Sequence, residues 1–407
     1  MHIPSERVYK EIRSEEAGAW FVLANGGEDT AVLVKLPTST AKSLLVGAKL
    51  ELLVGTKNGY LCAGIRIYDV PEAPVLFCSV HRHLEEHIAI QRISRSGTSP
   101  IFLFNEMGVC VAWSNIELSF QSCKEFQRFL SEHTEFYSGE YSEEAIAVLD
   151  KFCEITDSAM KVTDAALEIL ALPLTYDDWT SNRVYFYGQS ESHMISINDG
   201  EEGEVLERAV WASLESVFPQ TLTKTPKVQE GKKLRELTDI MATHEYGTFL
   251  MESKDLSVLR AGINRSRDRR LKGIQKQGLK AISQLVGASK TARSGARVLN
   301  HEGNSVELVL NQPMHCIVLL TELMHEGDWS EVVSALLEAS LETKEFFHIL
   351  DFRELISVLM FSNGDARLVD YNLMKRFECL VQSKSVHIRS RIGAAINPNE
   401  KINNILK

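Results

Sequence analysis

Two acidic residues and a lysine in the second half of the chain have the types and the spacing that phosphodiester chemistry needs. Asp239 lies in a strand-like run, and Glu252 and Lys254 lie on the next one, after a turn at 244–247. Side chains two apart on a strand project from the same face, so Glu252 and Lys254 are expected to point together while Ser253 points away. If the two strands pair as a hairpin, Asp239 lies beside Glu252.

Two carboxylates at this position can hold Mg²⁺, which favours hard oxygen ligands and keeps several of its waters. The ion polarises a phosphoryl oxygen and lowers the pKa of a bound water. A lysine above that water can orient it and stabilise the negative charge that develops on the phosphate. Charges at the end of an apolar strand are costly unless they are paired or bound to a metal. The alternative interpretation of the three residues is a structural Glu–Lys pair at a sheet edge.

A basic segment follows these residues directly. Residues 260–297 contain eleven Lys and Arg and one acid, Asp268, so the segment carries +10 in a chain whose formal net charge is −11. Phosphate contact is the natural use of such a patch, and a solvated helix face is the alternative. The residues predicted to contact nucleic acid are Arg265, Arg267, Arg269, Arg270, Lys272, Lys276 and Lys280.

The scaffold that must position these groups reads as α/β. The sequence predicts helices over 203–214, about 266–288, 329–343 and 365–382, and strands over 236–243, 248–254, 305–310, 315–320 and 346–350. Asp351 is expected to cap a helix after the last of these strands, with Glu354 at capping-box spacing. This order of elements predicts a mixed central sheet.

The order of these motifs resembles the restriction-endonuclease-like, or PD-(D/E)xK, superfamily. The residues that carry the resemblance are Gly203-x3-Glu207, Asp239, Glu252-x-Lys254 and a following helix with a glutamine. The runs similar to a bacterial group of nuclease-like proteins are 236–240, 249–254, 284–288 and 346–351. Thr238 stands where the motif has its proline. The resemblance covers about residues 200–385 and implies a restriction-endonuclease-like core with a mixed central sheet.

The resemblance also implies roles for individual residues. Asp239 and Glu252 correspond to the metal ligands and Lys254 to the catalytic lysine. Glu207 corresponds to an outer metal ligand, either direct or through water.

Gln284 corresponds to an active-site or DNA-contacting residue, a role that Gln275 or Gln277 could hold instead. The implied activity is that of an endodeoxyribonuclease dependent on Mg²⁺, with Mn²⁺ as a substitute. Because an unregulated nuclease is toxic, we expect the effector of a bacterial defence system, with DNA and other components of that system as partners. Cleavage of both strands favours a homo-oligomer. The alternative is a non-catalytic nucleic-acid-binding or scaffold protein that retains the nuclease fold.

The first half of the chain offers structure but no chemistry. Residues 1–118 read as a β-rich module, 119–198 as a helical and linking region, 199–385 as the nuclease domain and 386–407 as a tail. Asn58-Gly59 separates two strand-like runs and predicts a hairpin, because both residues tolerate positive φ. The predicted strands of this module are 20–24, 31–36, 50–54, 60–68, 75–80, 100–104 and 109–113.

Several other classes of protein are disfavoured. No apolar run is long enough to span a membrane, and the N-terminus lacks the apolar region of a secretory signal. The seven cysteines include no CxxC pair, which favours a cytoplasmic location. No G-x4-G-K-[ST] motif is present. His83-Leu84-Glu85-Glu86-His87 matches a zinc-peptidase pattern, but we interpret it as an exposed polar element.

Overall fold

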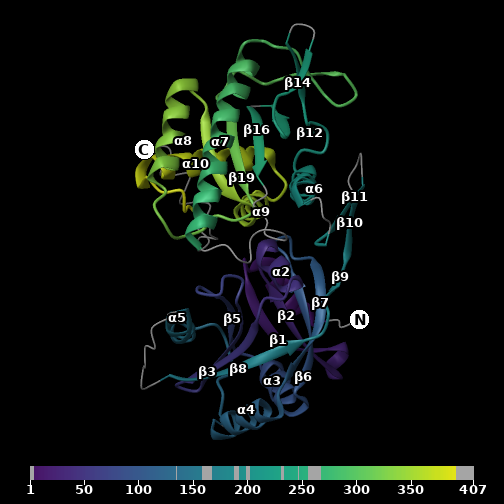
Figure 1. Cartoon of the computed structure of the whole chain (residues 1–407), viewed down its shortest axis with the longest axis vertical. Coiled ribbons are helices and arrows are strands. Elements are labelled where there is room, and N and C mark those ends of the chain that lie inside the picture. The colour runs from purple at the N-terminus through teal and green to yellow at the C-terminus, as the bar shows by residue number, and fades with distance from the viewer. Residues whose placement is uncertain are drawn as a thin grey trace, which may run out of the picture. The chain divides into compact units, whose positions relative to one another are not determined.

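The computed structural model describes residues 4–133, 135–157, 167–187, 192–198, 202–230, 233–245, 247–254 and 267–390. The chain divides into two compact units (Figure 1). The first comprises residues 1–187, 192–205 and 256–272, and the second comprises residues 188–191, 206–255 and 273–407. No helix among the described residues combines the length and the apolar character that crossing a membrane requires.

The first unit is built on a mixed sheet in the order β1-β2-β6-β7-β8-β3-β4-β5, with β9 beside β7. Neighbouring strands in this sheet are antiparallel, except β2 and β6, which run parallel to each other. The helices are α1 (Glu6–Ser14), α2 (Thr38–Leu45), α3 (Leu84–Ser96), α4 (Phe120–Glu132) and α5 (Glu143–Asp157). The strands are β1 (Gly18–Ala24), β2 (Asp29–Lys35), β3 (Leu50–Lys57), β4 (Tyr60–Ile67), β5 (Val75–His81), β6 (Thr98–Phe104), β7 (Cys110–Leu118), β8 (Glu168–Tyr176), β9 (Thr180–Ser181), and the separate hairpin β10 (Arg183–Tyr187) with β11 (Ser192–Ser196).

The strands predicted in residues 1–118 are all present, and the Asn58-Gly59 hairpin is confirmed. Asn58 and Gly59 adopt φ of 52° and 79° between β3 and β4, where Lys57 pairs with Tyr60. Residues 119–198 contain the expected helices, α4 and α5, but strands β8 to β11 follow them, and β8 lies between β7 and β3 in the sheet. Pro173 lies within β8, opposite Glu51 of β3 and just beyond the β7–β8 ladder, where strands tolerate proline.

The interpretation of 83–87 as an exposed element is wrong. Residues Leu84–Ser96 form α3, with His83 as its N-cap. Glu86 accepts hydrogen bonds from the backbone N–H groups of Arg82 (2.7 Å) and His83 (3.0 Å), which forms a capping box. His87 is buried, and its Nε2 lies 3.0 Å from the carbonyl oxygen of Tyr137. The pattern therefore lies at the start of a helix.

A buried histidine makes the first unit sensitive to acid. His81 is 1% exposed, and neither ring nitrogen has a hydrogen-bond partner among the described residues. Burial, with smaller contributions from His87 and Arg7, lowers the pKa of His81 to about 3. The unfolded chain therefore binds the proton more readily between that value and the ordinary value near 6.5, so stability is full above pH 6.5 and falls as the pH is lowered.

His81→Phe is expected to reduce this loss, because phenylalanine keeps the ring packed 5.6 Å from Phe21 without binding a proton. Between pH 7.5 and 5.5 the wild type should lose about 1.4 kcal/mol more unfolding free energy than the variant. Urea unfolding at the two pH values measures the difference. Equal losses in both proteins would contradict this explanation.

The second unit has a mixed sheet in the order β12-β15-β16-β19-β20 and a smaller sheet in the order β14-β13-β17-β18. Its strands are β12 (Thr223–Lys224), β13 (Lys227–Glu230), β14 (Lys233–Glu236), β15 (Ile240–His244), β16 (Gly247–Lys254), β17 (Val298–Leu299), β18 (Ser305–Val306), β19 (His315–Leu320) and β20 (Phe346–Asp351). Its helices are α6 (Glu202–Glu215), α7 (Arg267–Arg293), α8 (Ser330–Thr343), α9 (Phe352–Phe361) and α10 (Ala366–Ser383). The first residues of α6 and α7 are grouped with the first unit.

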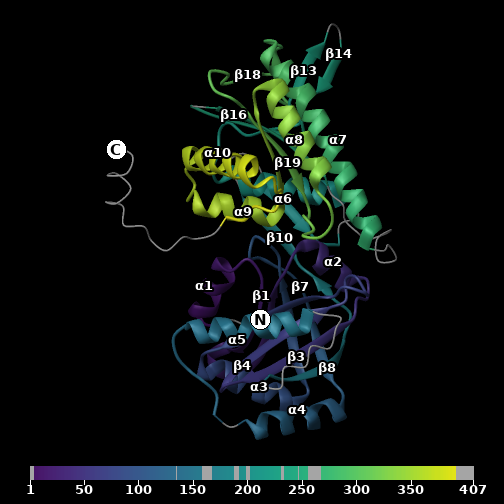
Figure 2. The ribbon, with the colours of Figure 1, turned by 90° about the vertical axis from the view of Figure 1, so that its left-hand side faces the viewer.

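Helices cover both faces of the larger sheet. Strands β16, β19 and β20 run parallel, and α7 and α8 connect them on one face, while α9 and α10 lie on the other (Figure 2). Gly278 of α7 packs closely on Ile349 of β20, since a Cβ at residue 278 would lie 3.3 Å from the Ile349 Cδ1. The sequence-predicted strand at 305–310 is mostly absent, because only Ser305–Val306 pairs.

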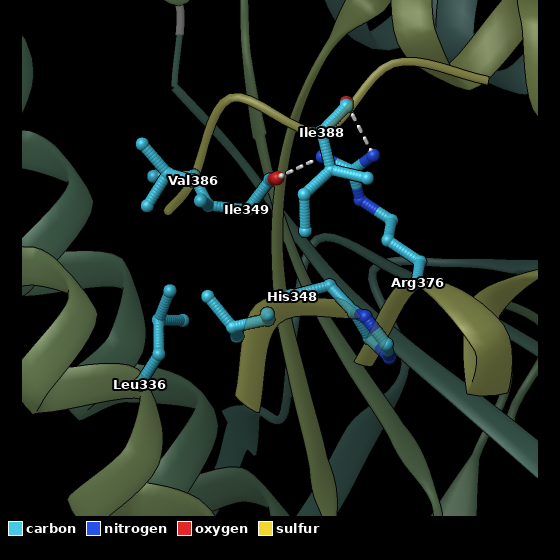
Figure 3. Close-up of a pocket in the computed structure, with 7 residues that line it drawn as sticks. Leu336, His348, Ile349, Arg376, Val386 and Ile388 are labelled. Atoms are coloured by element: carbon cyan, nitrogen blue, oxygen red, sulfur yellow. Dashed lines mark hydrogen bonds between the residues drawn. The ribbon is translucent and has the colours of Figure 1, made fainter. Parts of the chain in front are cut away.

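Residues 386–390 are part of the folded unit and not of a tail, while 391–407 lie outside the described residues. Arg376 of α10 donates hydrogen bonds to the carbonyl oxygens of Ile388 (2.6 Å) and Ile349 (3.2 Å), as Figure 3 shows. Arg389 binds both carboxylate oxygens of Asp351, which caps α9 as predicted. The cavity beside Arg376 has a volume of about 10 Å³, room for one water at most.

Candidate carboxylate and lysine site

The hairpin of β15 and β16 places Asp239 next to Glu252. The ladder pairs Ile240 with Met251 and ends with His244 opposite Gly247, at the predicted turn. Asp239 directly precedes Ile240, so it falls opposite Glu252. Asp239 is predicted to lie within one strand over 236–243, whereas β14 ends at residue 236 and β15 starts at 240.

Register decides which face of the sheet carries the site. Glu252 is aligned with Val318 of β19, which is aligned with Ile349 of β20. Residues aligned across a sheet point to the same face, and Ile349 faces Gly278 of α7. Glu252 therefore projects on the side covered by α7.

Lys254 lies between the two carboxylates. Its Nζ is 2.7 Å from Glu252 Oε2 and 3.8 Å from Asp239 Oδ2. Glu252 is 4% exposed, and burial raises its pKa, as does the charge of Asp239, while the hydrogen bond and the charge of Lys254 oppose that rise. The expected pairing of Glu252 and Lys254 on one face is thus confirmed.

Ser253 does not point away from the site as expected. Its backbone N–H donates to Asp239 Oδ2 at 2.6 Å, and its hydroxyl donates to the same oxygen at 3.1 Å. Asp239 precedes its strand, so its carboxylate is free to reach back across the ladder to residue 253. Ser253 therefore fixes one oxygen of Asp239 and leaves Oδ1 for other partners.

The carboxylates open into a cleft with a volume of about 600 Å³. The residues that line it are Arg235, Glu236, Leu237, Thr238, Asp239, Glu252, Ser283, Gln284, Gly287 and Ala288. Two segments that are distant in the sequence, residues 235–239 before β15 and residues 283–288 of α7, thus share one concave surface. Such a concave surface with convergent polar groups is the usual form of a ligand site.

Glu236 also lines this cleft, although its sequence position predicted no role for it. Burial raises its pKa most, followed by the charges of Asp239, Glu252 and Glu207. Those interactions show that the four carboxylates share one electrostatic environment. The available signal was the spacing of Glu236, three residues before Asp239.

Glu207 stands at the margin of the site. It lies on α6, is half-buried, and its Oε2 is 3.9 Å from the Nζ of Lys224. Glu207 does not line the cleft, but its negative charge contributes to the raised pKa of Glu236, which does.

Gln284 is the glutamine that the structure places at the cleft. Gln275, one of the two alternatives, donates from its side chain to the Asp328 carbonyl oxygen at 2.7 Å and so joins α7 to the start of α8. Gln277 does not line the cleft. The geometry therefore brings Gln284, and not the other two, together with Asp239 and Glu252.

Residues Arg267–Arg293 of the basic segment form α7, which extends five residues beyond the predicted end. Among the residues predicted to contact nucleic acid, four are exposed on this helix and Arg270 is half-buried. The exposed residues are Arg269, Lys272, Lys276 and Lys280. Arg265 and the side chain of Arg267 lie outside the described residues.

A second polar cluster, absent from the sequence predictions, lies on the opposite face of the sheet. His315 Nε2 is 2.9 Å from Asp370 Oδ1, His315 Nδ1 is 3.0 Å from His348 Nε2, and His244 Nε2 is 3.7 Å from Asp370 Oδ1. Burial alone would raise the pKa of Asp370, but the hydrogen bond with His315 and the nearby ring of His244 hold it well below its usual value. His315 is the first residue of β19, and Lys254 is the last residue of its parallel neighbour β16. The histidine cluster therefore lies at the opposite end of the strands from Lys254, where it joins α10 to the sheet.

The donor set of the cleft suits a hard divalent cation. Mg²⁺ is commonly bound through one or two carboxylates and keeps several waters, so a closed protein cage is not required. In the part of the chain that the structure describes, no group of three Asp, Glu, His or Cys side chains is placed to hold a metal ion. Asp239 and Glu252 are the pair that would hold Mg²⁺, because both face the same cleft and the same ammonium group.

Comparisons of the chain with protein-family models, with curated proteins and with solved structures return no match. The assignment of a function therefore depends on the geometry and chemistry of this cleft.

Proposed function

We propose that the second unit is a metal-dependent nuclease of the PD-(D/E)xK type that hydrolyses phosphodiester bonds in DNA. The observation that carries this proposal is the position of the Lys254 ammonium, between two carboxylates at a cleft that also contains Gln284. The antiparallel pair β15–β16, joined through α7 to the parallel strands β19 and β20, is compatible with a restriction-endonuclease-like core.

Each residue of the site has a distinct part in the proposed hydrolysis. Asp239 and Glu252 would hold the ion, and Ser253 keeps Asp239 oriented through two hydrogen bonds. A divalent ion, when bound, supplies Lewis-acid polarisation of a phosphoryl oxygen and of a water molecule. Lys254 places a positive charge beside the phosphate, where negative charge develops during attack.

The wider assignment follows from the same chemistry. A nuclease that cuts DNA harms its own host unless it is restrained, which supports a role as the effector of a defence system. A homo-oligomer would present two clefts to the two strands of a duplex. The first unit would then serve as the part that recognises a partner or a trigger.

Incubation of the purified full chain with supercoiled plasmid tests the proposal. Nicked or linear products are expected with Mg²⁺ or Mn²⁺, and none with EDTA, because the two carboxylates need the ion to act on the phosphate. A labelled RNA transcript in the same assay separates DNA from RNA as the substrate. Binding of plasmid without any cleavage would instead favour a non-catalytic protein that retains the fold.

A further inference from the structure

One face of α7 combines exposed positive charge with the wall of the cleft. Arg269, Lys276 and Lys280 precede Gly287 by 18, 11 and 7 residues, which are about five, three and two whole turns of an α-helix. These four residues therefore form a line on one face. All four are exposed, and Gly287 lines the cleft beside Gln284.

The remaining cations near the end of the helix are used in the fold. Lys290 pairs with Glu342 of α8. Arg293 binds Glu345 through both arms of its guanidinium group and also donates to the carbonyl oxygen of Gln312. Among the described residues, by contrast, neither Lys276 nor Lys280 forms an ion pair. On α7, the positive charge left for a ligand therefore lies on the N-terminal side of the cleft.

The spacing of this line suits a polyanion better than a single anion. Lys276 and Lys280 are about 6 Å apart along the helix axis, and Lys280 and Gly287 about 10 Å apart. These intervals are on the scale of the phosphate spacing along one nucleic-acid strand. Arg269 and Gly287 are about 27 Å apart along the helix axis, which is too far for a lone phosphate to contact both ends of the line.

From this arrangement we infer that one nucleic-acid strand lies along α7, with phosphates on Lys280, Lys276 and then Arg269, and with the reacting phosphate in the cleft. The inference rests on the proposed nuclease function and adds a direction to it. Because the unpaired cations of α7 lie on one side of the cleft only, a strand that follows this helix should need phosphates on one side of the cleaved bond and not on the other.

Salt dependence of binding tests the first part. Fluorescence anisotropy measures the binding of a labelled DNA duplex over a range of KCl concentrations. The proteins compared are the Asp239→Asn variant and the same variant that also carries Lys276→Gln or Lys280→Gln. Each lysine change should reduce the slope of log K against log salt by about 0.9, because one phosphate contact is lost. Lys290→Gln removes the same charge from the same helix and should leave the slope unchanged. Equal slopes for all three variants would overturn the inference.

DNA substrates with uncharged backbone linkages test on which side of the cleavage site the phosphates are needed. Methylphosphonates are placed one to four positions from the cleavage site, on the 5′ side or on the 3′ side, in substrates for the wild-type chain. The cleavage rate should fall when the neutral linkages lie on one side of the cleavage site and stay unchanged when they lie on the other. Where the phosphate that Lys276 contacts is already neutral, Lys276→Gln should cause no further loss of rate. An equal loss on both sides overturns the inference while the nuclease function stands. If unmodified DNA is neither bound nor cut, both fail.

Discussion

Replacing Lys254 by methionine is expected to slow DNA cleavage by a factor of about 100 to 1000 in single-turnover assays. The Lys254 Nζ lies 2.7 Å from Glu252 Oε2, on one of the two carboxylates that would hold the ion. Methionine keeps the apolar stem of the side chain and removes only the charge that would stabilise the transition state. A quenched time course with enzyme in excess over labelled duplex measures the rate.

A matched variant shows whether a loss of cleavage rate is specific to Lys254 or follows from the removal of any positive charge. Lys290→Met removes the same charge at an exposed pair with Glu342, away from the cleft, and should retain the wild-type cleavage rate. Thermal unfolding of both variants verifies that they are folded. If Lys254→Met cuts DNA as fast as the wild type, Lys254 has no part in the reaction.

Arg376→Met is expected to lower the unfolding free energy of the second unit by about 3–5 kcal/mol. The Arg376 guanidinium is buried, and it donates to Glu354 Oε1 at 2.9 Å as well as to two carbonyl oxygens. Its removal leaves the Glu354 carboxylate, which is 1% exposed, without its nearest guanidinium. Breaking one side of a buried ion pair is costly because the remaining charge cannot be solvated.

Urea unfolding of the full chain, followed by circular dichroism, measures this loss. Arg367→Met provides the control on the same helix, since its pair with Asp365 is exposed and should contribute about 1 kcal/mol or less. Equal unfolding curves for the two variants would show that the contacts of Arg376 do not stabilise the docked segment 386–390.

The parts of the fold that depend on neighbouring residues were predictable from the sequence. Alternation along β16 placed Glu252 and Lys254 on one face. The turn at 244–247 set the register of the β15–β16 hairpin, and Asn58-Gly59 set the register of the β3–β4 hairpin. Each of these follows from backbone geometry over a few residues. For the same reason Asp351 could be recognised as a helix cap, although the side chain of Glu354 does not complete the predicted capping box and binds Arg376 instead.

The contacts that depend on distant pairing were not predictable in this way. The place of β8 in the middle of the first sheet is set by pairing with β3, more than a hundred residues earlier. The cluster of His315, His348 and Asp370 forms only when β19, β20 and α10 come together. Glu236 was within reach, because it is three residues from Asp239, but its role in the cleft depends on where β14 ends.

The central claim is that the cleft at Asp239 cuts DNA with the help of a divalent ion. The most direct test is the plasmid assay at saturating Mg²⁺ with wild type and Asp239→Asn side by side. Asparagine has nearly the same shape and can still accept the hydrogen bond from the Ser253 N–H, so the fold should be kept while one metal-binding carboxylate is lost. We predict that the wild type nicks the plasmid and that Asp239→Asn, with an unchanged unfolding midpoint, does not. Cleavage by Asp239→Asn at the wild-type rate would contradict the account.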